Sequence, residues 1–268
     1  MIALVAQLAG LAAIGTTIGR MGVAEQSRAT AWVRAAIWAL AVLVTVEGLL
    51  GALGLLHAAG PTLIALGVVA VALRARFPAR FRAPGRQAEV TTAADAGLAT
   101  ALLGGLAVRL AAGLHKTFFL YDALSYHLHA PATWLADGRL SIVPAVFGDP
   151  AAAYAPANLE LWFAFLMAPL RSDYLAGVGQ LPFAGLAALA VAAAAREAGA
   201  RREAALGGAL AFLLVPEVWQ QARTAMTDLG MAALLLSGMP FLFRLRRAAS
   251  TADLLAVAAA MGLAIGTK

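Results

Sequence analysis

Two polar segments hold the residues that could do chemistry. Residues 115–129 include a base, an acid, a tyrosine and a histidine pair that could take part: Lys116, Asp122, Tyr126, His127 and His129. Residues 216–228 supply Arg223 and Asp228. Carboxylates suit proton transfer, and an arginine offers a planar fork of donors that matches phosphate. These residue types therefore suit acid–base chemistry beside an anionic group.

The spacing of the acidic residues allows two interpretations. If a helix resumes at Asp122, then Asp122, Tyr126 and His129 share one face, at i, i+4 and i+7. Asp122 is also well placed to cap that helix, and Thr227 or Asp228 could cap the apolar run that follows. The two interpretations are compatible, because a carboxylate at a helix start can also lie at the mouth of a site.

The two histidines do not form an obvious metal site. On a regular helix His127 and His129 point about 200° apart, since each residue turns the chain by about 100°. A site on a strand would need a third ligand. Hydrogen bonding at a membrane interface is expected for each. The residues name no cofactor, and a divalent metal stays an open alternative.

A short apolar stretch follows the first polar segment. Residues 130–139 predict an amphipathic helix that ends at Gly138, with Trp134 at a headgroup boundary. Tyr154, Asn158 and Glu160 then lead into residues 159–170, which are too few to cross a bilayer and contain Pro169. Such a segment is tolerated at membrane depth only where it packs on protein or lines a cavity. We therefore expect these polar residues to line a site.

The elements that must position these residues are membrane helices. The chain has 268 residues, 62% of them hydrophobic and 13% charged, with a mean hydropathy of +0.82. This composition leaves too little polar surface for a water-soluble protein. Without cysteines the chain has no disulfides or thiolate ligands. Eight apolar runs predict membrane spans: residues 1–19, 35–56, 61–73, 96–114, 174–195, 204–215, 229–243 and 254–266. The expected fold is all-α: a polytopic transmembrane helix bundle of about eight spans, plus interfacial or re-entrant helices.

The basic residues predict the orientation. If residues 159–170 do not cross, one face holds 14 Lys and Arg, including the five arginines of residues 74–95, and the other face holds four. A crossing segment would nearly equalise the two faces, so the positive-inside bias favours the first arrangement. The site then lies on the extracytoplasmic face of a bacterial-type inner membrane. The charge of +6 is a topology signal, and no nucleic-acid partner is expected. Within the spans, Glu47 and Arg109 must face protein, snorkel or pair with a carboxylate.

The residues 121–128 (YDALSYHL) and 134–140 (WLADGRL) resemble the first extracytoplasmic loop of GT-C glycosyltransferases, closest to the branch of protein O-mannosyltransferases and aminoarabinose transferases. Residues 216–229 and 262–268 also resemble that branch. The likeness covers residues 96–268, with the first extracytoplasmic loop at 115–158. Residues 1–95 are expected to add transmembrane helices and a basic cytoplasmic loop.

The resemblance implies transfer of a sugar from a polyprenyl-phosphate donor to a glycan, lipid or protein acceptor, with inversion. Asp122 corresponds to the essential first-loop acid and Asp228 to the second outer acid, whereas Ala123 replaces the family's second adjacent acid. Arg223, Lys116 and Arg139 would bind the donor phosphate. The remaining polar residues would line the acceptor side: Tyr126, His127, His129, Tyr154, Asn158 and Glu160.

Family members usually continue through further spans. We therefore expect this chain to correspond to their N-terminal part, as a truncated frame, a fragment or a reduced homologue, with a partner chain as one possible source of the remainder. The alternatives are a non-catalytic scaffold or assembly partner and, less favoured, a transporter subunit, which should place broken helices at the bilayer midplane.

Overall fold

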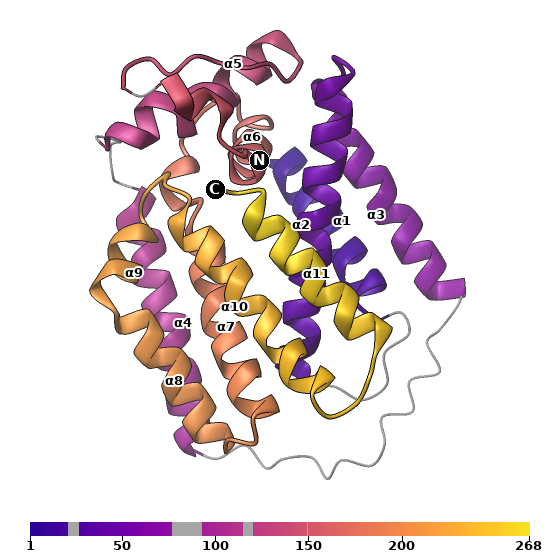
Figure 1. Ribbon diagram of the computed structural model, residues 1–268, viewed down its shortest axis with the longest axis vertical. Coiled ribbons are helices and arrows are strands. Elements are labelled where there is room, and N and C mark those ends of the chain that lie inside the picture. The colour runs from indigo at the N-terminus through magenta and orange to yellow at the C-terminus, as the bar shows by residue number, and fades with distance from the viewer. Residues whose placement is uncertain (21–26, 77–92, 115–119, 149) are drawn as a thin grey trace.

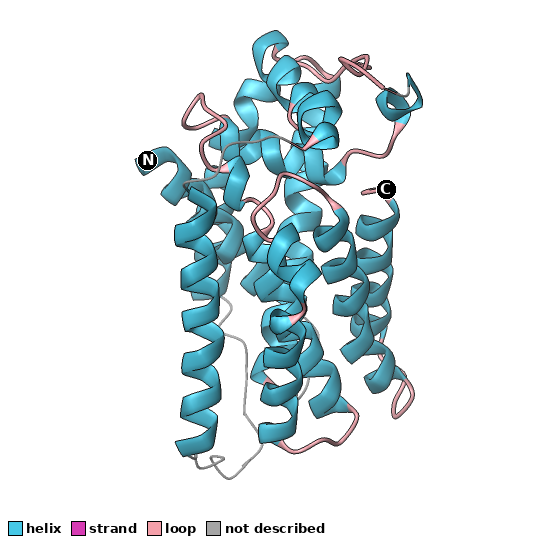
Figure 2. Ribbon diagram, turned by 90° about the vertical axis from the view of Figure 1, so that its left-hand side faces the viewer, coloured by secondary structure: helices cyan, strands magenta, loops and turns pink. Residues whose placement is uncertain are grey.

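The computed structural model describes residues 1–20, 27–76, 93–114, 120–148 and 150–268, and within these ranges it is all-helical, with no strand (Figures 1 and 2). Eight of the helices coincide with the eight apolar runs. These are α1 (Ile2–Ile18), α2 (Arg28–Ala52), α3 (Ala59–Arg76), α4 (Ala93–Leu114), α7 (Leu181–Glu197), α8 (Arg202–Leu214), α10 (Asp228–Leu245) and α11 (Thr251–Ile265). Shorter elements lie between them: η1 (Leu56–Ala58), η2 (Ala123–His127), α5 (His129–Asp137), η3 (Pro150–Tyr154), α6 (Asn158–Met167), η4 (Ala176–Val178) and α9 (Pro216–Gln221).

Among the residues that the structure describes, four segments are long and apolar enough to cross a membrane: Arg28–Ala52, Leu56–Arg76, Ala176–Glu197 and Asp228–Leu245. Helix α3 is longer than the apolar run predicted at residues 61–73, because it extends from Ala59 to Arg76. Large apolar side chains also cover the outside of the bundle, with Ile2 88%, Val68 65% and Leu103 68% exposed. Exposed apolar surface of this extent needs an apolar environment or a partner to cover it.

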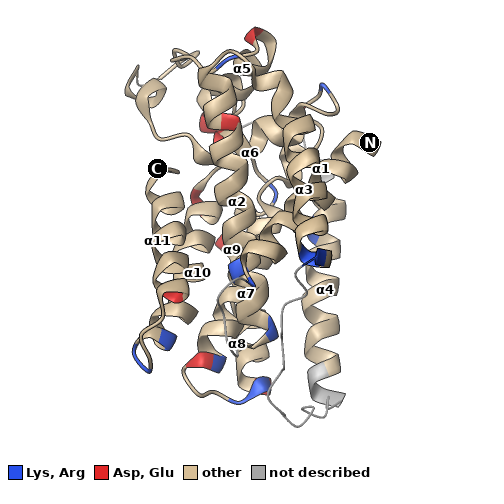
Figure 3. Ribbon diagram, turned by 90° about the vertical axis from the view of Figure 1, so that its right-hand side faces the viewer, with Lys and Arg blue, Asp and Glu red and all other residues tan. Residues whose placement is uncertain are grey.

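The helices alternate in direction, so their ends form two layers. At one end, which we call the basic end, the start of α2 meets the ends of α7 and α10 and the start of α11, and most of the Lys and Arg of the bundle lie toward it (Figure 3). At the other, which we call the α6 end, Asn158 N–H donates to Gly266 O at 2.9 Å and Gly230 N–H donates to Gln180 Oε1 at 2.9 Å. Helices α5 and α6 lie there, with both chain termini nearby (Figure 1).

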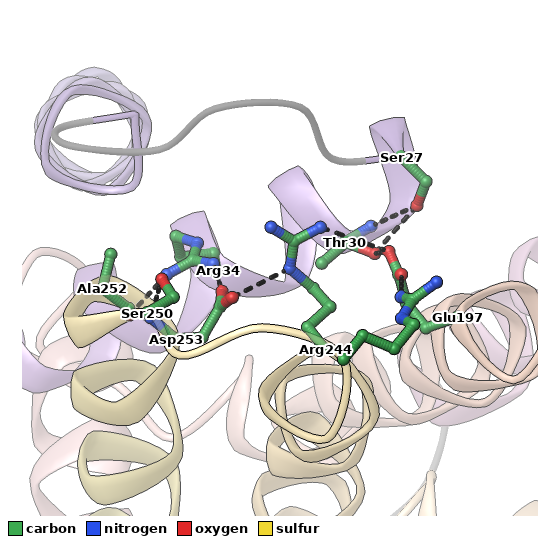
Figure 4. Close-up of polar contacts among 9 residues, drawn as sticks. Ser27, Thr30, Arg34, Glu197, Arg244, Ser250, Ala252 and Asp253 are labelled. Atoms are coloured by element: carbon green, nitrogen blue, oxygen red, sulfur yellow. Dashed lines mark hydrogen bonds and ion pairs between the residues drawn. The ribbon is translucent and has the colours of Figure 1, made fainter.

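A network of ion pairs ties four helices together at the basic end (Figure 4). Asp253 of α11 accepts from Arg34 of α2 and, at 3.0 Å, from Arg244 Nε of α10. Glu197 of α7 accepts from Thr30 Oγ1 at 2.9 Å and pairs with Arg247. Arg34 is almost wholly buried and is matched by a carboxylate, which is the condition for burying a guanidinium.

Helix α6 is a short buried element, too short to cross a bilayer. It ends at Met167, before Pro169, and residues 159–167 are all buried. Ten helical residues span about 15 Å, half the apolar thickness of a bilayer. Its start touches the end of α11, and the start of α7 touches the start of α10, so both lie at the α6 end.

Local signals explain where several helices begin and end. Ser27 Oγ accepts from Thr30 N–H at 3.1 Å, and Ser250 Oγ accepts from Asp253 N–H at 3.2 Å, so each serine caps its helix. Gly138 adopts φ 70° and ends α5, as predicted. Helix α2 packs on α6, α7, α10 and α11, so the segment before residue 96 and the segment after it share one bundle.

Candidate functional site

The centre of the candidate site is a buried histidine–carboxylate pair. His127 Nδ1 lies 2.5 Å from Glu160 Oε1, joining η2 to α6, and both side chains are buried. Their other polar atoms, His127 Nε2 and Glu160 Oε2, are buried without a hydrogen-bond partner among the described residues. A proton on Nδ1 shared with Glu160 leaves the lone pair of Nε2 available. The pair is therefore chemically equipped to accept a proton.

Asp122 is a hydrogen-bond partner of Tyr126, the residue next to His127. Helix begins at Tyr121 and widens into the π-helical turn η2, so Asp122 is inside the helix and its side chain caps no backbone N–H. The capping interpretation of Asp122 is wrong, because its carboxylate is hydrogen-bonded to Tyr126 one turn later. Burial, followed by the charge and hydrogen bond of Asp122, raises the pKa of Tyr126 to about 12, and Glu160 and Asp228 add to the effect. Tyr126 is thus influenced by one carboxylate of its own turn and by two from segments farther along the chain.

Asp228 joins the site from the start of α10. Its carboxylate pairs with Lys268 Nζ and accepts from Gln221 Nε2 at 3.5 Å. Neither Asp228 nor Thr227 caps the helix, which corrects that interpretation, and Thr227 Oγ1 is buried without a described partner. Gln180 braces the same turn through Gly230 N–H. The carboxylate of Asp228 is therefore held by side chains rather than used to begin a helix.

Arg223 contacts an aromatic ring, and no acid among the described residues pairs with it. Its guanidinium carbon lies 5.3 Å from the ring centre of Trp219, and that of Arg109 lies 4.1 Å from the same centre. Arg109 is buried and donates to Gly105 O at 3.0 Å and to Leu213 O. Of the expected alternatives, Arg109 thus faces protein, and backbone carbonyls of α4 and α8 hold it instead of a described carboxylate. Glu47 faces protein as expected and is buried in α2.

The remaining predicted residues are spread around this centre. Asn158 donates from Nδ2 to Leu263 O at 3.0 Å and so anchors α6 to α11. His129 is half-buried at the start of α5, while Arg139 is exposed and Tyr154 is 74% exposed. Lys116 lies outside the described residues. These positions share the α6 end, but no described contact joins His129, Arg139 or Tyr154 to the pair.

Trp134 has a structural role instead of the predicted role at the membrane interface. Trp134 is buried and donates from Nε1 to Ser141 O at 2.8 Å, so its indole packs inside the protein instead of at a headgroup boundary. In the part of the chain that the structure describes, no three His, Asp or Glu side chains are grouped to hold a metal ion.

Several features of the site could not be found from sequence spacing. The pairing of His127 with Glu160 joins residues 33 apart in the chain. Gln180 and Ser125, which are fully buried and each have an unpartnered side-chain atom, carry no sequence signal beyond being polar within apolar segments. The signal for Glu160 was its place in the first turn of an apolar stretch. The signal for Arg109 was its charge within a predicted span.

No protein-family model, curated protein or solved structure matches this chain. The function is therefore argued from the site itself.

Proposed function

We propose that this chain is a multi-span membrane glycosyltransferase of the GT-C type, which moves a sugar from a polyprenyl-phosphate donor to an extracytoplasmic acceptor. One observation supports this most. Asp122, Glu160 and Asp228, from segments up to about 100 residues apart, all contribute to the raised pKa of Tyr126, and Glu160 pairs with the neighbouring His127, at one end of an apolar helical bundle. Acid–base groups at one interface suit chemistry on a lipid-linked substrate, whereas a transporter would need them near the midplane.

The orientation in the membrane is part of the proposal. The eight helices that coincide with apolar runs alternate in direction, and the basic end carries the arginines of α2, α7, α8 and α10. By the positive-inside bias this end faces the cytoplasm. The α6 end, with Asp122, Glu160 and Asp228, then faces the periplasm of a bacterial-type inner membrane.

The reaction would be a single inverting displacement. The acceptor hydroxyl oxygen attacks the anomeric carbon from the side opposite the phosphate, the bond from that carbon to the phosphate oxygen breaks, and polyprenyl phosphate leaves with the bonding electrons. The hydroxyl proton passes to Asp122, whose hydrogen bond to Tyr126 orients it. Arg223, with Lys116 and Arg139, would stabilise the charge that develops on the phosphate.

The substitution Asp122→Asn tests this function. It keeps the shape and removes the base, so transfer from a polyprenyl-phosphate sugar should fall by about 100-fold or more at unchanged membrane abundance. Asp228→Asn should also reduce transfer, because Asp228 is the second carboxylate of the site. Asp137→Asn, an exposed acid at the same end, is the matched control. Unchanged transfer in both site variants would reject the enzyme and favour the scaffold alternative.

A further inference from the structure

Two arginines share the indole of Trp219 and have no acidic partner among the described residues. The guanidinium carbons of Arg109 and Arg223 lie 4.1 Å and 5.3 Å from the ring centre of Trp219. Arg109 is only 3% exposed. Among the described residues neither guanidinium takes part in an ion pair. Two positive charges therefore lie close together, one of them buried, without a carboxylate to balance them.

The basic end shows how this chain treats buried arginines when their role is structural. There Arg34 and Arg244 share the carboxylate of Asp253, and a second acid, Glu197, completes the network (Figure 4). Acids are also present in the segment that carries Arg223, but they are engaged elsewhere. Glu217 accepts from Gln221, and Asp228 pairs with Lys268. Among the described residues, the arginines around Trp219 thus differ from those of the basic end in having no carboxylate beside them.

The donors of the two arginines are arranged for an acceptor. Arg109 Nε and Arg223 Nε are both buried without a hydrogen-bond partner in the described chain. Each unmet buried donor costs about 1–3 kcal/mol, more when it is charged. The carbonyls of Gly105 and Leu213 fix the Nη atoms of Arg109, so its guanidinium is already ordered. An anion with several oxygens would satisfy both donors and both charges at once.

The surroundings favour an anion that carries an apolar chain. On α4, Val108 and Leu110 beside Arg109 are exposed, and Leu214 and Val215 are exposed at the end of α8, next to the carbonyl that holds Arg109. Apolar surface on both elements flanks the charged pair. A free inorganic ion would leave this surface uncovered, whereas the hydrocarbon chain of a lipid phosphate would cover it.

We propose that Arg109, Arg223 and Trp219 form a binding site for the phosphate group of a membrane lipid, with Arg109 as the buried anchor. The inference rests on the proposed function for one point, which is that the lipid is the polyprenyl-phosphate carrier. It extends that function by assigning the phosphate to an arginine inside α4 and to an indole, in addition to Arg223. The several oxygens of a phosphate can accept from both guanidinium groups, whereas a single carboxylate offers fewer acceptor sites.

The test is equilibrium binding of radiolabelled polyprenyl phosphate to the purified full chain in maltoside micelles, which contain no phosphate. Arg109→Gln and Arg223→Gln should each weaken binding by about 10-fold or more, the equivalent of about 1.4 kcal/mol. Arg171→Gln, at an exposed arginine, should bind as the unchanged protein does. The uncharged polyprenol should bind weakly to all of them. Thermal unfolding of each variant separates lost binding from lost folding, and Arg109→Lys covers the case in which Arg109→Gln does not fold.

The outcomes separate this site from the reaction. Folded Arg109→Gln or Arg109→Lys protein with unchanged affinity overturns the site. Inorganic phosphate that binds as tightly as polyprenyl phosphate overturns the assignment to a lipid. Because no acceptor is present, Asp122→Asn should keep full affinity. Loss of binding in Arg109→Gln together with normal transfer by Asp122→Asn would retain the lipid site and reject the proposed function, and the reverse result would reject the site alone.

Discussion

His127 and Glu160 show how a polar pair can hold two segments together inside an apolar bundle. Each is buried, and each still has one atom without a described partner. Removing one member leaves the other buried without its hydrogen bond, which costs far more than an exposed pair would. The pair therefore contributes to stability as well as to the candidate site, and variants must separate the two effects.

The two single variants and their double variant give that separation. Glu160→Leu or His127→Leu should lower the free energy of unfolding by about 2–4 kcal/mol, because a polar partner is stranded in the interior. The double variant, which removes both, should recover part of that loss. Unfolding in graded denaturant measures all three, with the exposed Glu217→Gln as control. A double variant as unstable as the sum of the single variants would contradict a coupled pair.

The raised pKa of Tyr126 should be measurable in an alkaline titration. Burial and the neighbouring Asp122 raise its pKa to about 12 from an ordinary value of 10. The folded state therefore holds the proton more tightly than the unfolded state, so this contribution to stability is complete below about pH 10 and is lost as the pH rises through about 12. Absorbance of the ionised phenol near 295 nm should show a late titrating step that Tyr126→Phe removes. Tyr154→Phe, at an exposed tyrosine, should keep that step, and its absence from the unchanged protein would contradict the buried setting of Tyr126.

At the scale of the elements, α1 and α3 pack closely because glycines face each other. A Cβ at Gly67 would overlap the Cα of Gly10, and a Cβ at Gly10 would lie 2.8 Å from the carbonyl oxygen of Leu63. Such contacts between small residues let helices approach where no hydrophobic gradient drives them together. Both glycines are buried within their helices.

The substitution Gly67→Ala should therefore destabilise the protein by about 1–3 kcal/mol, because backbone must move to admit the methyl group. Gly48→Ala makes the same chemical change in α2, where a Cβ would meet nothing within 4 Å. There the gain in helix propensity should leave stability equal or slightly higher, by up to about 1 kcal/mol. Thermal unfolding of the two variants in the same detergent compares them. Equal effects at both positions would contradict close packing of α1 on α3.

The elements also show what the sequence could and could not predict. Long apolar runs predict helices because lipid leaves the backbone no other partner, and each of the eight runs overlaps an α-helix over most of its length. The helix ending at Gly138 was equally clear, since only that residue supplies a positive φ there. The contact of Asp122 with Tyr126 follows from their i, i+4 spacing, whereas the burial of Thr227 and Trp134 was not predictable, because it depends on tertiary packing. The same holds for Glu160, whose partner comes from η2.

At the scale of the whole molecule, the two ends are built on different principles. The basic end buries its arginines against Asp253 and Glu197, so its charges are compensated locally (Figure 4). The α6 end keeps buried polar atoms without described partners, at His127, Glu160, Gln180 and Thr227. Such atoms cost stability unless a ligand or water satisfies them. The division places a structural clamp at one end and the candidate chemistry at the other.

The difference between the two ends predicts how the chain is oriented in the membrane. The chain contains no cysteine, so single introduced cysteines can test this orientation. Ala136 and Ala248 are exposed residues at the α6 end and the basic end. In intact cells an impermeant maleimide should label Ala136→Cys, and it should label Ala248→Cys only after the membrane is opened. The reason is that basic segments are retained in the cytoplasm, which leaves the opposite end outside. Labelling of Ala248→Cys in intact cells would reverse the orientation, and labelling of both at once would contradict an odd number of crossings between them, since α7, α8 and α10 separate the two positions.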